Sequence, residues 1–492
     1  MKRTAMLLIF GWMCLMSAGA LALTVTGLET DAIDRQWETN AFFARMETLT
    51  GVRTQAHGVN DEEEYAGLIS RMEKGDIQSD VLFKANLTRE QEYALLDSGA
   101  IADLAPYIDT HMPNLSALLA ANPQWKEIIA LDDGRIASLP LLNTQERQAC
   151  MWINRKWLGQ LGLEMPRTMD ELTAALEKIR DGDLNGNGKK DERALDLLGV
   201  YEMRWLLPYF GVVADDYHMA RDEQGRIVFA PQLPAYRAFI EQVKAWYESG
   251  VLRSDAFTSV HSTTALSDSE DETLLSGMLF SMTPYTHVSI QAVPDYVPLL
   301  LADPQGNIRW RDLLGEVWTG CFAVTRACED IGAALRWADA LYAQEGALLA
   351  YAGVENEDYT VASDGTWSFV LDGRRDINAI RSEVVIYTGA AAPGLYPADF
   401  ISRVNSSVDR HVFEASESVR AVSEQVIPAY ALSRKDQAQA DRLAAVLGGL
   451  VDRGIARFVT GEVPLDDAHY QQWLDELEHA GSKELAALYR EK

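Results

Sequence analysis

The amino-acid sequence predicts an α/β protein with two domains, and three observations lead to this prediction. The chain has 492 residues, which is more than a single compact core usually holds. Predicted strands alternate with amphipathic helices along most of its length, the order that parallel sheets require. Hydrophobic residues make up 48% and charged residues 24% of the chain, a balance typical of globular rather than disordered proteins.

The N-terminal segment has the pattern of a secretory leader. Lys2 and Arg3 precede a short apolar run, and small residues follow at Ala20 and Ala22. This order of a basic region, an apolar region and an A-x-A site predicts a signal peptide over residues 1–22. A retained membrane anchor is the alternative, although the apolar run is short for a full span. We therefore expect an extracytoplasmic protein, either periplasmic or secreted.

The N-terminal part of the mature chain predicts alternating strands and helices. Residues 22–28 form an apolar run that predicts a buried strand. The next helix carries Phe42, Phe43 and Met46 on one face and ends at Gly51. The remaining elements of this part are expected over residues 52–59 (strand), 65–72 (helix), 79–85 (strand) and 104–125 (helix or loop, broken by Pro106, Pro113 and Pro123).

Residues 150–154 predict the strand that opens a second domain. After it, Thr168 and Glu171 form a capping-box pattern, and Leu172 begins an apolar stripe at helical spacing. A later amphipathic helix stops at Gly250. Further elements are expected over 224–232, 277–288 and 320–325 (strands), 234–249, 331–343 and 433–461 (helices), and a final helix with Tyr470, Trp473, Leu474 and Leu477; the acidic, serine-rich segment 261–273 is expected to be a solvated connection.

Charge and missing motifs exclude several classes of function. The chain has 73 acidic and 44 basic residues, so its net charge of −29 repels phosphate backbones and anionic lipids. Nucleic-acid binding is therefore not expected. The sequence contains no HExxH or GxSxG motif, and its eight histidines are scattered. Abundant acids alone do not indicate a glycosidase, so we expect a protein that is not an enzyme.

The four cysteines give no metal or redox signal. Cys14 lies in the leader, and its neighbours do not form a lipoprotein box, so a lipid anchor is not expected. In the mature chain, Cys321 and Cys328 could pair or stay as buried free thiols, because spacing alone does not decide between the two. Cys150 is then left over. The chain has no CxxC pair, so zinc or thiol-redox chemistry has no support.

Residues 181–192, DGDLNGNGKKDE, form the most chemically loaded stretch. Counted from Asp183 as position 1, oxygen donors stand at positions 1, 3, 5 and 9, glycine at position 6 and a backbone carbonyl at position 7. This is the spacing of a calcium loop, except that Ala194 takes the place of the bidentate acid at position 12. A polar helix-capping turn without metal is the alternative. A phosphate loop is excluded, because no glycine lies five residues before Gly188 and Asp191 follows Lys190.

Several stretches resemble one family in the same order along nearly the whole mature chain. They are MWINRKWLGQLGLEMPRTMDELTAALEKIRDGDLNGNGKKDE, YRAFIEQVKAWYESGVL, DYVPLLLADPQGNIRW, AALRWADALYAQEGALLAYAGVENEDYTV and ARFVTGEVPLDDAHYQQWLDELEHAG. The family comprises the extracellular solute-binding proteins (family 1) of carbohydrate ABC transporters. The subgroup with this calcium loop includes the alginate-oligosaccharide binders and the large sugar-binding proteins of Gram-positive bacteria.

The resemblance implies a periplasmic-binding-protein-like fold. In this fold two α/β lobes are joined by a hinge, with a ligand cleft between them. The resemblance implies that the chain crosses the hinge near residues 140–149, 316–320 and 391–402. It also implies that Glu192 substitutes for the missing acid of the calcium loop, so the expected ligands are Asp183, Asn185, Asn187, the Lys189 carbonyl, Asp191 and Glu192, and the calcium is structural. The expected division is residues 23–143 and 316–395 for the N-terminal lobe, and 144–315 and 396–492 for the C-terminal lobe.

Aromatic and charged residues near the expected cleft are candidate ligand contacts, because sugars offer apolar faces between hydroxyl rims. The chain has 12 tryptophans and 18 tyrosines, so most of them must pack in the core, as expected for Trp246, Trp337 and Trp473. For each candidate, the alternative to ligand contact is ordinary packing in the core or the hinge. The candidates are Asp34, Trp37, Glu146, Arg147, Trp205, Tyr285, Trp318 and Tyr387.

The expected function is the extracytoplasmic binding subunit of an ABC importer. It would bind an oligosaccharide by lobe closure, act as a monomer and deliver the sugar to membrane permease subunits. Three alternatives stay open at this point. The same fold could bind a peptide or another solute, it could serve a sensor instead of a permease, or the chain could be a secreted carbohydrate-active enzyme.

Overall fold

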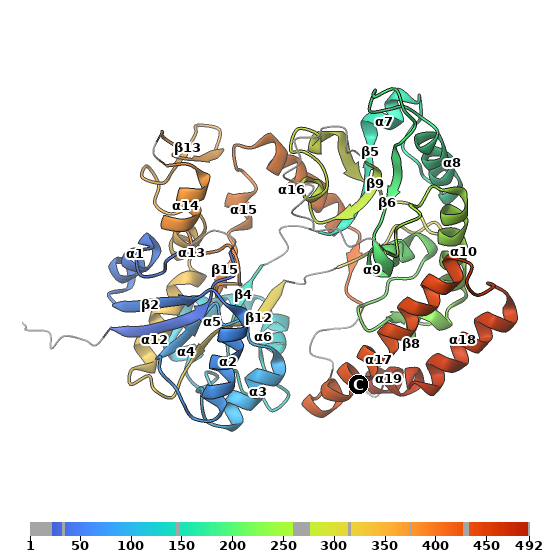
Figure 1. Ribbon diagram of the computed structural model, residues 1–492. Helices are drawn as coiled ribbons and strands as arrows, with labels where there is room; N and C mark the ends of the chain where they lie inside the picture. The colour runs from blue at the N-terminus through green and yellow to red at the C-terminus, as the bar shows by residue number, and fades with distance from the viewer. Residues whose placement is uncertain are drawn as a thin grey trace, which may run out of the picture.

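The structure, a computed structural model, describes residues 22–31, 35–143, 148–258, 276–312, 316–373, 375–426 and 432–490. It consists of two α/β lobes, each built around its own sheet (Figure 1). The predicted two-lobe α/β fold is confirmed. None of the helices in these ranges is long and apolar enough to cross a membrane.

The N-terminal lobe is built on a six-stranded sheet. The strand order is β15-β4-β12-β3-β1-β2, in which β12 alone runs antiparallel to its neighbours. The strands are β1 (Leu23–Leu28), β2 (Thr54–Val59), β3 (Val81–Phe83), β4 (Leu139–Leu142), β12 (Val317–Val324) and β15 (Gly394–Leu395). The helices packed around it are α1 (Ala41–Thr50), α2 (Glu62–Glu73), α3 (Arg89–Asp97), α4 (Ile108–His111), α5 (Pro113–Ala121), α6 (Pro123–Ile129), α12 (Ile331–Asp339) and α13 (Gln344–Tyr351).

Helix α1 shows how local sequence sets these elements. Its N-cap, Asn40, accepts a hydrogen bond from the Phe42 backbone N–H at 2.9 Å, and Gly51 ends the helix with φ of 70°. Phe42, Phe43 and Met46 are all buried against the sheet, as the sequence predicts. An excursion after α13 adds β13 (Tyr359–Val361), β14 (Trp367–Phe369), α14 (Ile377–Glu383) and α15 (Ala398–Ile401).

The C-terminal lobe is built on a four-stranded sheet of order β10-β5-β9-β6, with β5 antiparallel to β9 and β10. Its strands are β5 (Cys150–Asn154), β6 (Arg193–Asp196), β9 (Ser276–Ser281) and β10 (Tyr296–Pro298). Its helices are α7 (Arg155–Gln160), α8 (Met169–Arg180), α9 (Gly199–Arg204), α10 (Pro234–Ser249), α16 (Ser407–Arg420), α17 (Arg434–Val459), α18 (Asp467–His479) and α19 (Ser482–Arg490). Short ribbons and 3₁₀ turns complete the chain: β7 (Met219–Arg221), β8 (Ile227–Phe229), β11 (Trp310–Arg311), β16 (Ser423–Glu424), η1 (Leu207–Phe210), η2 (Ala230–Gln232), η3 (Pro284–Thr286), η4 (Val293–Asp295) and η5 (Ala340–Tyr342).

Two details differ from the sequence-based expectation, and one alternative that the sequence left open is decided. Thr168 caps α8 by accepting from the Glu171 N–H, but Glu171 reaches back to the N–H of Arg167, so the capping box is not closed on Thr168. A second C-terminal helix, α19, follows the predicted final one. Cys321 and Cys328 are buried free thiols in this structure, as is the third mature cysteine.

Residues of the two sheets follow the expected order along the chain, but the exact domain boundaries stay a prediction. One buried core gathers residues of β5, β6 and β9 with α10 and α17, and another gathers β1, β3, β4 and β12 with α1 and α12. Because β12 already begins at Val317, most of the expected second crossing lies inside a strand of the N-terminal lobe.

Candidate functional site

The carboxyl ends of three strands meet at one edge of the N-terminal sheet. Strands β1 and β3 are parallel, and β3 and β4 are both antiparallel to β12, so all three point the same way. Glu29, Lys84 and Asn143 directly follow these strands. In open α/β sheets, ligands bind outside the carboxyl ends of the strands. This edge is therefore the candidate site of the N-terminal lobe.

A buried charge network covers that edge. Glu29 pairs with Arg35 at 2.7 Å and with the Lys84 ammonium at 3.1 Å, and the Trp37 indole N–H donates to the same carboxylate at 2.9 Å. Lys84 also donates to the Thr388 carbonyl at 2.7 Å. Burial raises the pKa of Glu29, but Lys84 and Arg35 overcome this and hold it below its usual value. Burial lowers the pKa of Lys84 to about 8.

The network extends to the segment before the third crossing. Asp31 pairs with Arg35 at 3.0 Å and with Arg381 at 3.0 Å, and it accepts a hydrogen bond from the Thr388 hydroxyl. Arg35 in turn donates to the Arg381 carbonyl at 2.8 Å. These contacts fix residues 381–388, which contain the predicted ligand residue Tyr387, against the ends of β1 and β3.

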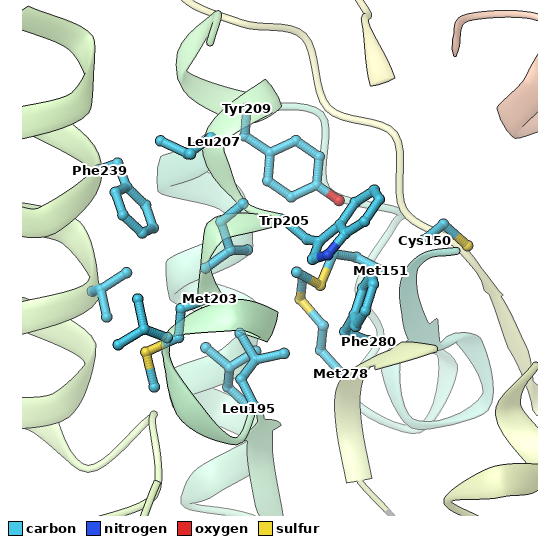
Figure 2. Close-up of a cluster of buried hydrophobic side chains, with 14 of the residues drawn as sticks. Cys150, Met151, Leu195, Met203, Trp205, Leu207, Tyr209, Phe239, Met278 and Phe280 are labelled. Atoms are coloured by element: carbon cyan, nitrogen blue, oxygen red, sulfur yellow. The ribbon is translucent and has the colours of Figure 1, made fainter. Parts of the chain in front are cut away.

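The matching edge of the C-terminal lobe is aromatic. Strands β6 and β9 are parallel, and α9 follows β6 directly. Trp205, just after α9, stacks on Phe280 of β9 with ring centroids 4.8 Å apart, and the Arg311 guanidinium lies 5.0 Å from the Trp205 ring. Figure 2 shows Trp205 and Phe280 packed among Tyr209, Met151 and other buried side chains of this lobe. Trp205 is therefore a core residue with only 3% of its surface exposed.

Tyr201 offers the accessible ring at this edge. It is 44% exposed and packs edge-on against Trp205, with centroids 6.4 Å apart. Together with Arg204, His218 and Arg311, these two rings line a small pocket. The sequence-based selection included Trp205 and missed Tyr201, because no strand was predicted over residues 193–196, whose carboxyl end precedes Tyr201.

Charges surround this pocket. Arg311 pairs with Asp216 at 2.7 Å, and an Arg204 nitrogen lies 3.1 Å from the His218 ring. Burial and the nearby Arg204 cation lower the pKa of His218 to about 3, so this imidazole is neutral at physiological pH. Burial raises the pKa of Asp215 to about 6. The pocket thus combines an exposed aromatic face with guanidinium donors, which is the mixture that polyhydroxylated ligands require.

The other predicted aromatic contacts differ in accessibility. Trp318 is 46% exposed, and the strand β12 has a bulge between Trp318 and Phe322. The bulge includes Gly320, which has a φ of 78° and where a Cβ would lie 2.1 Å from the Leu87 carbonyl oxygen, so that only glycine fits. Trp37 is only 1% exposed, so its ring presents no face to solvent in this structure.

Tyr285 and Tyr387 are partly buried. Tyr285 follows β9 and packs against the core of the C-terminal lobe, and Tyr387 stacks on Tyr351 with centroids 4.6 Å apart. The predicted contacts Asp34, Glu146 and Arg147 lie outside the described residues. The whole predicted ligand set stays untested.

The predicted calcium loop joins α8 to β6 and is organised by its own oxygen atoms. The Asp183 carboxylate accepts from the Gly188 N–H at 3.1 Å, and the Asn187 side-chain oxygen accepts from the Lys189 N–H at 2.8 Å. Glu192 is 7% exposed; one carboxylate oxygen accepts from the Asn185 N–H at 3.1 Å, and the other is buried without any hydrogen-bond partner. An orphaned carboxylate oxygen in a loop of oxygen donors is what a hard cation would satisfy.

The loop lies at the opposite end of β6 from the aromatic pocket. It precedes Arg193, the first residue of β6, whereas α9 and Tyr201 follow the carboxyl end of the same strand. Among the described residues, no group of three or more His, Cys, Asp or Glu side chains is arranged for a metal, so amides and a backbone carbonyl would have to complete the ligand set.

Comparisons with known proteins identify the fold. No protein-family model matches the chain. The fructooligosaccharide ABC transporter substrate-binding protein FusA of Streptococcus pneumoniae is 31% identical over 170 residues, a match that spans only 32% of each chain. A structure of FusA in complex with kestose superimposes with a TM-score of 0.75 at 19% identity, covering 96% of this chain and 98% of that one. The chain has the fold of a carbohydrate solute-binding protein.

Two further solved structures share this solute-binding-protein fold. A human-milk-oligosaccharide (HMO)-binding solute-binding protein of an ABC transporter from Bifidobacterium longum infantis gives a TM-score of 0.79 at 19% identity over 96% of this chain and 98% of that one. The alginate-binding protein AlgQ2, solved without calcium ion, gives 0.67 at 17% identity over the same shares. The resemblance read from the sequence, including its two-lobe architecture, is confirmed by these comparisons.

Proposed function

We propose that the protein is the extracytoplasmic solute-binding subunit of an ABC importer and that it binds an oligosaccharide between its lobes. The observation that carries this proposal is the placement of exposed aromatic rings, Trp318 and Tyr201, at the strand-end edges of two separate lobes. A ligand that contacts both edges is bound most strongly when the lobes approach each other, so binding shifts the population toward a closed state. Permease subunits of the transporter are the proposed partners, and the chain acts without transforming its ligand.

Each edge has its own part in this mechanism. The accessible rings of Trp318 and Tyr201 would stack on the apolar faces of sugar units. Arg311 and Arg204 line the C-terminal pocket and supply hydrogen-bond donors for hydroxyl groups. The buried network around Glu29 keeps the opposite edge fixed, so that little ordering entropy is lost on binding.

The test is a titration of the full chain with defined oligosaccharides, followed by calorimetry and intrinsic tryptophan fluorescence. Kestose, human-milk oligosaccharides, N-glycan fragments and alginate oligosaccharides are the probes, because they cover neutral and acidic sugars. We expect stoichiometric binding to one class, weakened about tenfold or more by Tyr201→Ala and by Trp318→Ala. Tyr247→Ala on the outer helix α10 is the matched control and should bind normally.

Other outcomes would redirect the assignment. Binding of a peptide library member with no sugar binding would favour the same fold with another solute. Release of shortened sugar products would favour a carbohydrate-active enzyme. If no sugar binds and both edge variants behave as the wild type, the proposal is wrong.

The proposal includes a structural calcium ion in the loop of residues 183–192. Structures described as an EF-hand mutant of FusA and as AlgQ2 without calcium ion belong to proteins of the same fold. Here the partnerless oxygen of Glu192 supports a cation in the loop. The ion would be held by Asp183, Asn185, Asn187, the Lys189 carbonyl, Asp191 and Glu192. When bound, the ion would neutralise the negative charge of the loop that connects α8 to β6.

Chelation tests this site. Because an ion bound only by the folded state stabilises it by mass action, we expect a chelator to lower the melting temperature and added calcium to restore it. Glu192→Gln should abolish the calcium-dependent shift, whereas Asp181→Asn, at the exposed C-cap of α8, should retain it. Sugar affinity should change less than about twofold, since the loop lies at the far end of β6. A loss of affinity by orders of magnitude without unfolding would contradict a structural role.

A further inference from the structure

Glu316 brings a carboxylate to the strand-end edge of the N-terminal sheet. It directly precedes β12, whose first residue, Val317, pairs with Leu142 at the carboxyl end of β4. Because β12 runs antiparallel to β4, the start of β12 and the end of β4 lie at the same edge. Glu316 is partly exposed and stands two residues before Trp318, the accessible ring of this edge. A carboxylate therefore accompanies the aromatic ring that the proposed function assigns to the ligand.

A buried donor fixes one oxygen of Glu316. The indole N–H of Trp125 donates to Glu316 Oε2 at 2.7 Å. Trp125 is 6% exposed and belongs to α6, which packs against β12. Because a buried indole N–H needs a hydrogen-bond partner, this contact holds the carboxylate in one orientation. A ligand hydroxyl would thus meet an acceptor that is already ordered.

The carboxylate partner distinguishes Trp125 from most other tryptophans of the molecule. The indole N–H groups of Trp152, Trp310 and Trp367 donate to backbone carbonyls at 2.7–2.8 Å. Within the described ranges, only Trp37 and Trp125 donate to carboxylates, and both of these carboxylates lie at the N-terminal strand-end edge. A neutral carbonyl would satisfy an indole equally well. The hydrogen bond from Trp125 therefore does not by itself account for a charged group at position 316.

The two carboxylates differ in their remaining capacity to bind a ligand. Glu29 is buried, pairs with Arg35 and Lys84 and accepts from the Trp37 indole. Glu316 forms no ion pair with any described residue, and Trp125 is the one side chain among them that donates to it. A carboxylate has about four lone-pair positions for hydrogen bonds. Glu316 therefore retains acceptor positions that Glu29 has already filled.

The C-terminal edge offers the complementary groups. Arg204 and Arg311 line the pocket beside the exposed ring of Tyr201, and both are hydrogen-bond donors. A sugar hydroxyl both donates and accepts, so an oligosaccharide between the lobes also requires acceptors. A carboxylate accepts from a hydroxyl more strongly than a neutral oxygen does, and it repels the carboxylate of an acidic sugar.

We propose that Glu316 is a ligand contact that accepts a hydrogen bond from a sugar hydroxyl beside Trp318 and selects a neutral sugar over a uronic acid at this edge. Trp125 positions the Glu316 carboxylate for this contact. The net charge of −29 acts in the same direction, since it disfavours anionic ligands. This role rests on the proposed function, because it concerns the same ligand site.

Calorimetric titration of the full chain tests this role. Kestose and neutral human-milk oligosaccharides are the neutral probes, and alginate oligosaccharides are the acidic probe. We expect the parent to bind a neutral probe. Glu316→Gln keeps the size of the side chain but removes its charge, so it should weaken that binding about tenfold or more. The preference for neutral over acidic probes should shrink at the same time.

Trp125→Phe tests the positioning of the carboxylate. This substitution removes the N–H donor and keeps an aromatic ring, so it should weaken binding of the neutral probe about threefold. In the Glu316→Gln background, the same substitution should have little further effect on affinity, because Trp125 acts through Glu316. Equal effects of Trp125→Phe in the two backgrounds would contradict the positioning role.

Glu329→Gln is the matched control, since Glu329 is an exposed carboxylate beyond the opposite end of β12. It makes the same change of charge and should bind as the parent does. Glu316→Asp keeps the charge but withdraws it by one methylene group, so it should also weaken binding of the neutral probe. Melting temperatures show which variants fold, and Glu316→Asp provides the test if Glu316→Gln does not fold.

The outcomes separate Glu316 from the proposed function as a whole. If Trp318→Ala and Tyr201→Ala weaken binding while Glu316→Gln binds like Glu329→Gln, Glu316 is not a ligand contact and the proposed function stands. A parent that prefers alginate oligosaccharides to the neutral probes overturns the selection by Glu316 and also leaves oligosaccharide binding intact. Failure of the parent to bind any sugar overturns the proposed function and the role of Glu316 with it.

Discussion

The two strand-end edges are stabilised by different kinds of interaction. At the N-terminal edge, Glu29, Arg35 and Lys84 are fully buried charges that satisfy one another, and Trp37 serves as one more hydrogen-bond donor. At the C-terminal edge, Trp205 and Phe280 form a stacked apolar floor. Burying charges is costly unless every partner is present, whereas an aromatic stack depends on packing area. The first edge should therefore be sensitive to the loss of one charge and the second to the loss of volume.

The largest expected effect is at the charge network. Glu29→Gln leaves Arg35 and Lys84 buried without their shared anion, so we expect a loss of about 3–5 kcal/mol in the free energy of unfolding. Urea titration of the full chain measures it. Glu357→Gln removes an exposed partner of Arg45 and should cost no more than about 1 kcal/mol. Equal effects of the two substitutions would remove the distinction between the edges.

At the aromatic edge, size rather than charge should decide. Trp205→Ala opens a cavity against Phe280 and Trp310, and we expect a loss of about 3 kcal/mol in unfolding free energy. Tyr201→Ala, at the exposed ring beside it, should cost less than about 1 kcal/mol while affecting ligand binding. The same urea titration compares them. If Tyr201→Ala destabilised as strongly as Trp205→Ala, the accessible ring would be a packing residue instead.

The smallest effect is a pH response of the C-terminal edge. Glu202 of α9 accepts a hydrogen bond from the Leu198 N–H at 2.6 Å, and burial raises its pKa from 4.5 to about 7. The folded state holds this proton more tightly than the unfolded state. The free energy of unfolding that Glu202 contributes therefore falls as pH rises from about 4.5 through 7. Glu202→Gln keeps an acceptor but not the charge.

We therefore expect Glu202→Gln to be more stable than the parent by about 1–2 kcal/mol at pH 8, with the difference vanishing near pH 4. Thermal unfolding at several pH values measures this difference. A stability difference that is independent of pH would show that Glu202 does not titrate in this range.

Local patterns were enough to predict many of the helices and strands, although not β6, α9 or α16. The Asn40 cap and Gly51 stop define α1, and the apolar stripe that begins at Leu172 predicts the buried face of α8, because capping and helical periodicity act over a few residues. The alternating oxygen donors of residues 183–192 likewise predict a loop whose atoms already face one another. The extra helix α19 was missed although Gly481, with φ of 107°, and Ser482 mark the break after α18.

Which aromatic residue faces outward could not be predicted in the same way. Trp37 and Trp205 follow strand ends as a ligand contact should, yet both are buried, while Tyr201 and Trp318 are exposed. The exposure of an aromatic ring depends on which side chains from neighbouring strands pack against it. Phe280 comes from β9 and Arg311 from the ribbon before β12, both far along the chain from Trp205.

The sequence by itself predicts the alternating order of strands and helices, a leader over residues 1–22 and the spacing of the calcium loop, since each depends on residues that are close together in the chain. Only the tertiary structure decided that Glu29, Arg35 and Lys84 share one buried site, and that Arg434 meets Asp97 across the gap between the lobes. Glu29 and Lys84 are 55 residues apart, and Arg434 and Asp97 are 337 apart. Such pairs form because the sheets and the crossing segments place distant elements together, which no local pattern encodes.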